Sequence, residues 1–131
     1  MTVVDSSGWI EFLHGTERAR LYEPALRHME QVVVPSLVIF EVHRLIAAKR
    51  GEAVADAATS IMRKCRIAAL DATLAIRASG LARQYKLAMA DAVIYATAQE
   101  CGAKLWTQDS HFKDLPGVRF FSKTEPNAKG A

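Results

Sequence analysis

Five short runs of hydrophobic and β-branched residues recur along the chain, and segments of helical length separate most of them. The runs cover residues 2–4, 32–34, 66–69, 104–107 and 118–121. Runs of this length and composition are typical of strands that are largely buried. Strands that alternate with helices in this way predict an α/β fold with a mainly parallel sheet.

The intervening segments carry signals for helix ends. Helices are predicted from Pro35 to about Arg50, from Asp71 to about Tyr85, and from Ala90 to Gly102. Asp71 is a suitable N-cap, and Gly51 and Gly102 are suitable residues to end a helix. Residues 11–31 are also helical in pattern, but Pro24 is not expected in an unbroken helix interior. We therefore expect a kink or two short helices there.

Composition indicates one globular domain. The 131 residues are 50% hydrophobic and 24% charged, which is ordinary for a folded domain and unlike a disordered chain. A chain of this length can bury a core without disulfides or structural metals. Residues 122–131 are polar and small, so we expect residues 1–121 to form the domain and residues 122–131 to form a flexible tail.

Cysteine use and hydropathy exclude several classes of protein. Cys65 and Cys101 stand singly in hydrophobic stretches, without the spacing of a disulfide framework or a metal motif. The N-terminus lacks the pattern of a signal peptide, and no apolar run reaches the roughly 18 residues of a membrane span. We therefore expect a reduced, cytoplasmic chain that does not enter a membrane.

The net charge of +3 and the pI near 9.0 suit a polyanionic partner. The excess is small, however, and the lysines and arginines are scattered, with local groups at residues 49–50 and 63–66. Such groups are equally consistent with solvated helix faces. Charge alone therefore does not identify nucleic acid as the partner.

Acidic residues recur near the ends of predicted strands and the beginnings of predicted helices. In a parallel sheet with right-handed crossovers these positions meet at one edge, and ligand sites gather at that edge. The acidic residues that share it are Asp5, Glu41, Asp71, Asp91 and Asp109. Topology alone therefore gives five candidates and excludes none of them.

Glu41 is the most informative candidate, because its neighbours on the predicted helix are mainly apolar. The residues within about 60° of it are Leu37, Val38, Arg44, Leu45 and Ala48. A buried carboxylate needs a cation, a proton or a donor network, and an ion pair with Arg44 is one alternative. The aspartates also have a simpler interpretation, because aspartate at a helix start or in a Thr-x-Asp turn commonly caps the backbone.

Four segments contain Asp5, Glu41, Asp91 and Asp109 in turn. They are Val-Val-Asp-Ser-Ser-Gly-Trp-Ile at 3–10, Pro-Ser-Leu-Val-Ile-Phe-Glu-Val at 35–42, Leu-Ala-Met-Ala-Asp-Ala-Val-Ile-Tyr-Ala-Thr-Ala at 87–98, and Leu-Trp-Thr-Gln-Asp-Ser-His-Phe at 105–112. In this order and at this spacing they resemble the motifs of the PIN domains, and within that family the short toxins called VapC. The resemblance extends from Val3 to about Phe120.

The resemblance implies a three-layer α/β/α sandwich with a central, mainly parallel five-stranded sheet. Its strand order, with the third strand at the margin, would carry Asp71 away from the other acids and leave it as a helix cap. It also implies a metal-dependent endoribonuclease whose catalytic residues are Asp5, Glu41, Asp91 and Asp109. Asp5 and Asp91 would be the principal metal ligands, and the other two would complete the cluster directly or through water. Carboxylates suit Mg²⁺ or Mn²⁺ rather than zinc.

Two residues with hydroxyl groups, Ser6 and Thr107, are candidates to orient a carboxylate or a water molecule. Ser6 stands where threonine is common in the resembling family, and this departure keeps the hydroxyl. Gln108 stands where a basic residue is frequent. That second departure weakens the expectation of a phosphate contact at this position.

Other functions stay open at this point. A metal-free ribonuclease would use histidines as acid and base, but His14, His28, His43 and His111 show no pairing in the sequence. The acidic site could instead hold a metal or a basic protein group without turnover. A nuclease of this family could also process RNA as a housekeeping enzyme rather than act as a toxin.

The helix predicted at residues 35–50 is apolar around too much of its circumference to bury all of these side chains against one sheet. In the layout of the resembling family, residues from the first helix lie nearby, which implies a groove for an antitoxin helix and a homodimer surface. The residues expected to contact partners are Trp9, Phe12, Leu13, Phe40, Arg44 and Leu45. The alternative is a helix that its own neighbours cover.

Overall fold

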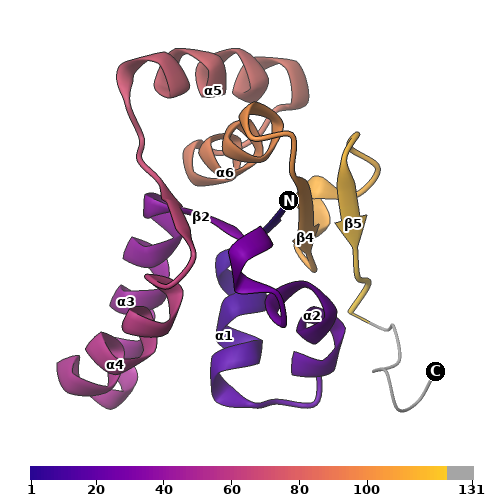
Figure 1. Ribbon diagram of the computed structural model, residues 1–131. Helices are drawn as coiled ribbons and strands as arrows, with labels where there is room; N and C mark the ends of the chain where they lie inside the picture. The colour runs from indigo at the N-terminus through magenta and orange to yellow at the C-terminus, as the bar shows by residue number, and fades with distance from the viewer. Residues whose placement is uncertain (124–131) are drawn as a thin grey trace.

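The computed structural model describes residues 1–123 (Figure 1). Its strands are β1 (Thr2–Val4), β2 (Val33–Pro35), β3 (Arg66–Ala68), β4 (Lys104–Thr107) and β5 (Val118–Phe120). Its helices are α1 (Ser6–His14), α2 (Ala19–Leu26), α3 (Ser36–Arg50), α4 (Glu52–Met62), α5 (Ala72–Tyr85) and α6 (Met89–Glu100), with 3₁₀ turns η1 (Met29–Gln31) and η2 (Ser110–Phe112). Each predicted strand is therefore present to within one residue at either end. Residues 124–131 of the predicted tail lie outside the described residues.

All strand pairs in residues 1–123 are parallel. β4 lies between β1 and β5, and β2 pairs with β3. A single parallel bridge between Thr2 and Val32 joins the two groups, which gives the order β3-β2-β1-β4-β5 across the molecule. The predicted mainly parallel sheet is confirmed, with β3 at its margin and β1 and β4 inside it. The connection between β1 and β2 is its weakest pairing.

Helices cover both sides of this sheet, as an α/β/α sandwich requires. In Figure 1, α1 and α2 lie below the strands, α5 and α6 lie above them, and α3 and α4 form an antiparallel pair at the side of β2. Residues 92–98 of α6 are all buried. A helix that is apolar around its whole circumference is one that neighbours cover on every side, and α6 is packed against the sheet beneath α5.

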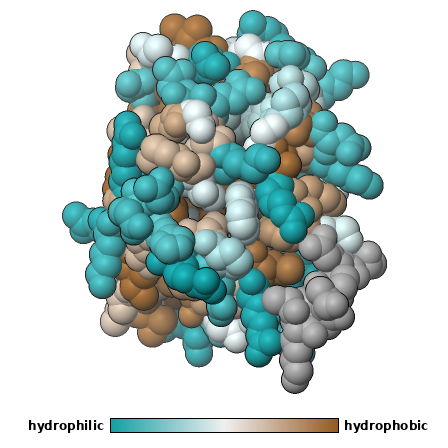
Figure 2. All heavy atoms as spheres, turned by 45° about the vertical axis from the view of Figure 1, so that its right-hand side comes forward, coloured by the Kyte–Doolittle hydropathy of each residue, from teal (hydrophilic) through white to brown (hydrophobic). Residues whose placement is uncertain are grey.

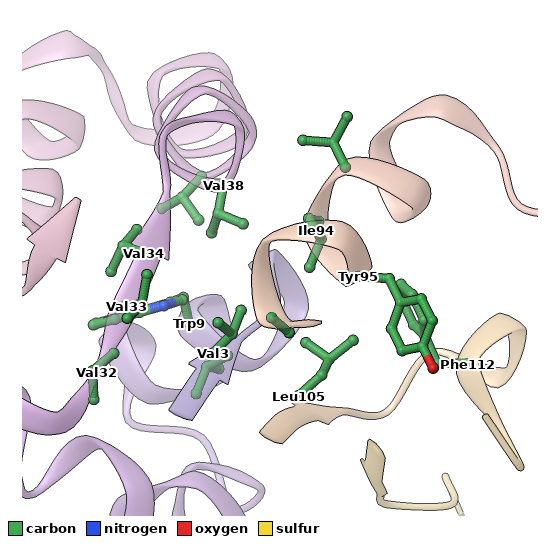
Figure 3. Close-up of a cluster of buried hydrophobic side chains, with 14 of the residues drawn as sticks. Val3, Trp9, Val32, Val33, Val34, Val38, Ile94, Tyr95, Leu105 and Phe112 are labelled. Carbon is green, nitrogen blue, oxygen red and sulfur yellow. The ribbon is translucent and has the colours of Figure 1, made fainter. Parts of the chain in front are cut away.

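The core forms where strand residues meet the helices of both layers. Figure 3 shows Val3, Val34 and Leu105 from three strands facing Val38 of α3 and Ile94 of α6. Each of these side chains is at most 2% exposed. On the face of the molecule drawn in Figure 2, hydrophilic side chains predominate, with hydrophobic residues in smaller patches between them. Within the described residues, no helix is both long enough and apolar enough to cross a membrane.

Helix boundaries follow the predicted caps with one exception. Asp71 accepts a hydrogen bond from the Leu74 N–H at 2.9 Å and opens α5, and Gly51 follows the last residue of α3. Pro24, however, lies inside α2. The break between α1 and α2 comes earlier, at Gly15, whose left-handed backbone ends α1. The prediction of two short helices is thus confirmed, but Pro24 is not the residue that separates them.

Candidate active site

Asp5 lies at the carboxyl end of β1, where its side chain also caps α1. Its Oδ1 atom accepts hydrogen bonds from the Ser7 hydroxyl and the Gly8 N–H, each at 3.0 Å, and its Oδ2 atom accepts one from the Thr107 hydroxyl. Gly8 is required here by space, because a Cβ atom would lie 2.6 Å from atoms of Tyr22 and Val4. The close approach of α1 to β1 and α2 thus fixes the donors to Asp5.

The carboxylate of Asp5 is buried, with 4% of the residue exposed. Burial raises its pKa from 3.8 to about 6, and the nearby charge of Asp109 adds to this effect, while the hydrogen bonds from Thr107, Gly8 and Ser7 oppose it. The folded protein alone therefore stabilises ionised Asp5 less well than water does. A cation beside it would favour the charged form.

Glu41 projects from the second turn of α3, next to the face that α3 buries through Val38, Val42 and Ile46. Its Oε1 atom is buried and has no hydrogen-bond partner within residues 1–123. Burial raises the pKa of Glu41, and the charge of Asp91 adds to this effect, whereas Ser6 and Arg44 lower it.

The ion pair that the sequence left open for Glu41 is absent from the described residues, where no basic side chain pairs with its carboxylate. Arg44 acts on Glu41 at longer range, through its charge alone. The buried oxygen of Glu41 is thus left for a ligand from outside the chain.

Asp91 and Asp109 meet at the same edge from α6 and from the turn after β4. Asp109 caps η2 by accepting the His111 N–H at 2.9 Å. Asp91 is not the N-cap of α6, because that position is Ala88, which makes no side-chain cap bond. Burial raises the pKa of Asp91, and the charge of Asp109 adds to this effect, whereas His111 opposes it.

His111 is a member of this cluster that the sequence did not indicate. Its Nδ1 atom lies 3.2 Å from Asp91 Oδ2 and 3.1 Å from Asp109 Oδ1. The ligand atoms of the three residues all lie within 4.8 Å of one another. The search for paired histidines could not find it, because its partners are carboxylates. The available signal was its position two residues after Asp109.

A cavity of about 470 Å³ contains all four acids. The residues that line it are Asp5, Ser6, Ser7, Glu41, Asp91, Ile94, Gln108, Asp109, Ser110, His111 and Lys123. Carboxylate oxygens in a partly buried site, one of them buried without a donor, suit a hard divalent cation such as Mg²⁺ or Mn²⁺. The donor set therefore fits a metal ion on the observations of this structure.

The two hydroxyl residues singled out in the sequence act at different places. Thr107 donates to Asp5 and also accepts the Asp109 N–H at 2.9 Å, so it connects two of the acids. Ser6 lies at Glu41, where it lowers the pKa of that residue. The serine hydroxyl that binds Asp5 is that of Ser7 rather than Ser6, and the sequence did not indicate Ser7. Asp71 lines a different cavity, with Glu100 and Cys101.

The residues expected to contact partner proteins separate into three groups. Trp9 is fully buried in the core, so the expectation that it lines a surface groove is wrong, and Figure 3 shows it among the buried hydrophobic side chains. Phe12 and Leu13 are half-buried at the edge of the core. Phe40, Arg44 and Leu45 lie on the exposed face of α3, with Phe40 58% exposed and Leu45 42% exposed.

Comparison with known proteins identifies relatives of this architecture. A family model described as PIN domain matches residues 2–118. A toxin-antitoxin complex from Klebsiella pneumoniae contains a chain of 26% sequence identity, aligned over 91% of this chain and 96% of that one with a TM-score of 0.77.

Two further solved structures share the fold. VapC20 of Mycobacterium tuberculosis, a toxin that cleaves the Sarcin-Ricin loop, is 22% identical over 90% of this chain and 97% of its own, with a TM-score of 0.73. A chain of a DNA-bound VapBC structure from Salmonella typhimurium is 18% identical over 92% of this chain and 98% of its own, with a TM-score of 0.70. No curated protein sequence matches this chain.

Proposed function

The chain belongs to the PIN-domain family, and on that basis we propose that it is a Mg²⁺- or Mn²⁺-dependent endoribonuclease and the toxin of a toxin–antitoxin pair. The observation that carries the proposal is the buried Oε1 atom of Glu41, which has no donor within residues 1–123 and lies in the same cavity as Asp5, Asp91 and Asp109. A structural carboxylate at this depth would be paired. An oxygen without a donor among three further acids is typical of a cation ligand.

The four acids have distinct parts in this proposal. Asp5 and Asp91 are the principal ligands, and Glu41 and Asp109 complete the set directly or through water. A divalent ion held there would neutralise charge on the scissile phosphate and lower the pKa of a water nucleophile. Thr107 and Ser7 hold the Asp5 carboxylate in place through their hydrogen bonds. Ser6 serves Glu41 in the same way.

In this proposal, His111 positions the carboxylates of Asp91 and Asp109. Its ring lies between Asp91 and Asp109, where a protonated imidazole would offset the repulsion of the two carboxylates. It is 70% exposed at its side chain, so it can turn away when a cation enters. The exposed Lys123 at the rim of the same cavity supplies a positive charge for the RNA backbone.

A protein partner is part of the proposal, because relatives of this fold are solved as toxin-antitoxin complexes. The surface that suits an antitoxin helix is an apolar groove of about 200 Å³ between α1, α3 and α4. It is lined by Leu13, His14, Ile46, Arg50, Val54, Ala57, Ala58 and Ile61. Val54 and Ile61 are 44% and 37% exposed, and a covering helix would remove them from water.

The test of the proposed activity is hydrolysis of a panel of structured and single-stranded RNAs by the full chain, with Mn²⁺, with Mg²⁺ and with EDTA. We expect internal cleavage with either metal and none with EDTA. Metal binding without hydrolysis of any RNA would indicate a silent binding module instead. Growth arrest on expression, reversed by Glu41→Gln, would separate a toxin from a housekeeping nuclease.

A further inference from the structure

A second cavity, of about 610 Å³, opens beside the acidic one between α1 and α3. It is lined by Ser6, Ser7, Ile10, Glu11, Glu41, Arg44, Leu45, Ala48 and Gln108. Ser6, Ser7, Glu41 and Gln108 line both cavities. The two spaces are therefore adjacent, so a polymer held at the acids would have the second cavity within reach.

The walls of this second cavity differ in chemistry. Ile10, Leu45 and Ala48 supply an apolar side. Arg44 supplies a cation that is exposed and forms no ion pair within the described residues, and its guanidinium carbon lies 5.8 Å from the centre of the Phe40 ring. An apolar wall beside an unpaired cation suits a ligand with one flat apolar part and one anionic part.

Gln108 forms the polar wall, and its amide is held in one orientation. Its Oε1 atom accepts from Arg18 Nε at 2.7 Å, and its Nε2 atom donates to Glu11 at 3.0 Å. Glu11 is itself fixed by a bond from the Thr16 hydroxyl at 2.8 Å. An amide nitrogen carries two protons and an amide oxygen two lone pairs, so Gln108 keeps a donor and an acceptor for a ligand.

We propose that this cavity is the subsite for the nucleotide next to the scissile phosphate. Its base would lie against Ile10 and Leu45, Gln108 would bind the base edge, and Arg44 would bind the following phosphate. The inference rests on the proposed ribonuclease function, and it adds a residue-level origin for sequence preference in an otherwise electrostatic contact with RNA. The volume is in the range of small-ligand sites, roughly 300–1,000 Å³.

Charge and polarity favour a nucleotide over a protein segment as the occupant. An antitoxin helix would bury an apolar face, and the groove at Leu13, Val54 and Ile61 fits that need better. The second cavity instead combines Arg44 with a fixed amide and lies directly beside the acids. Those properties match the phosphate and the hydrogen-bonding edges of an unpaired nucleotide.

The test measures binding rather than cleavage, so that its failure is separate from failure of the proposed activity. A fluorescein-labelled single-stranded RNA of about 12 nucleotides is titrated with Asp91→Asn protein in Mn²⁺, and anisotropy gives Kd. Adding Arg44→Gln should raise Kd about 5- to 10-fold and make the salt slope shallower by about 0.7. Lys49→Gln, the same charge change on an exposed residue of α3 outside the cavity, should raise Kd less than twofold.

A second pair of variants tests the cavity itself. Leu45→Glu places a carboxylate on the wall and should weaken binding about 10-fold, whereas Leu70→Glu, the same change at a residue of similar exposure between β3 and α5, should not. Thermal melts establish that all variants fold. Equal losses for cavity and control variants would indicate only general electrostatics and overturn the proposal. Unchanged RNA affinity in Arg44→Gln and Leu45→Glu would also overturn it, including the case in which these variants lose binding to an antitoxin.

Discussion

The hydroxyl of Thr107 donates a hydrogen bond to the carboxylate of Asp5, although the two residues are 102 positions apart in the chain. Each lies at the carboxyl end of its strand, and β1 and β4 are neighbours in the sheet. The same hydroxyl accepts the N–H of Asp109. Thr107 therefore sets the relative positions of two acids that come from opposite ends of the sequence.

Thr107→Val keeps the shape of this side chain and removes both hydrogen bonds. We expect Mn²⁺ affinity to fall by about 10- to 100-fold, the usual effect of losing a residue that orients a ligand, as measured by isothermal titration. Thr97→Val is the matched control, because Thr97 is equally buried but donates within α6, to Val93. Its Mn²⁺ affinity should stay within about twofold of wild type, even if both variants lose stability.

Asp91→Asn separates metal binding from helix capping. Wild-type protein in Mn²⁺ at about 100 times its Kd should gain roughly 2.7 kcal/mol of stability, and the variant should lose most of this gain because a charged ligand is gone. RNA cleavage should fall by orders of magnitude. Without metal, the variant should be at least as stable as wild type, because repulsion among the acids is reduced. The readouts are thermal melts and a cleavage assay.

Asp71→Asn is the control for this experiment, because Asp71 makes a true cap bond to Leu74. Asparagine caps helices about as well as aspartate, so Asp71→Asn should retain Mn²⁺ stabilisation and cleavage. If Asp91→Asn also retained both, Asp91 would not be a ligand. The assignment of the four acids would then have to be abandoned.

The metal-free protein should be more stable near pH 5 than near pH 7.5. Folded Asp5 has a pKa of about 6, above its ordinary 3.8. At a pH between these two pKa values, the folded state holds a proton that the unfolded chain has released. The free energy of unfolding therefore falls as pH rises through that interval. Only the upper part of this interval, from pH 5 to about 6, falls within the measured range, and it corresponds to about 1.4 kcal/mol. Denaturant melts at both pH values in EDTA measure it.

Asp5→Asn should remove much of this pH dependence. Asp114→Asn should preserve it, because Asp114 is exposed and has a left-handed backbone, which asparagine adopts readily. If the free energy of unfolding of the metal-free protein rose between pH 5 and pH 7.5, burial would not disfavour the ionised form of Asp5. That result would also remove the argument that the site requires a cation.

Phe40, which lies on α3 but does not line the proposed nucleotide subsite, should take part in self-association. Phe40 is 58% exposed, and burial of such an aromatic side chain is a common source of interface energy. We expect a wild-type dimer in sedimentation velocity at micromolar concentration and a shift toward monomer in Phe40→Asp. Ile76→Asp changes another exposed apolar residue, on α5, and should leave the dimer intact. The reverse pattern would move the interface to α5.

The strands were predictable because each is a short hydrophobic or β-branched run bounded by residues that prefer a turn or a helix start, although β3 and β5 are partly exposed. α3 was predictable for the same reason, since Gly51 follows it directly. The α1–α2 boundary was not, because Pro24 removes only one backbone donor from α2, and packing of Tyr22 and Leu26 in the core outweighs that loss. Local preference gives way to tertiary contacts in such a short helix.

The site was predictable in its carboxylates and in Ser6 and Thr107, but not in Ser7 or His111. Parallel topology gathers strand ends at one edge and so gave five acidic candidates, and the resemblance to PIN motifs selected four of them. The fifth, Asp71, makes a cap bond to Leu74. The positions of His111 and Gln108 depend on the turn after β4, whose path no periodic pattern describes. The burial of Trp9 depends on how closely α1 approaches the sheet, which Gly8 decides.

The insertion of β4 between β1 and β5 has a consequence for the time at which the proposed nuclease becomes active. β1 leaves the ribosome early in synthesis, but its neighbour in the sheet is made only when most of the chain has emerged. Until then Asp5 has no Thr107 beside it and no Asp109 to share a cation with. A chain that lacks β4 would therefore have an incomplete acidic site, so the proposed nuclease would gain its activity only after β4 has joined the sheet.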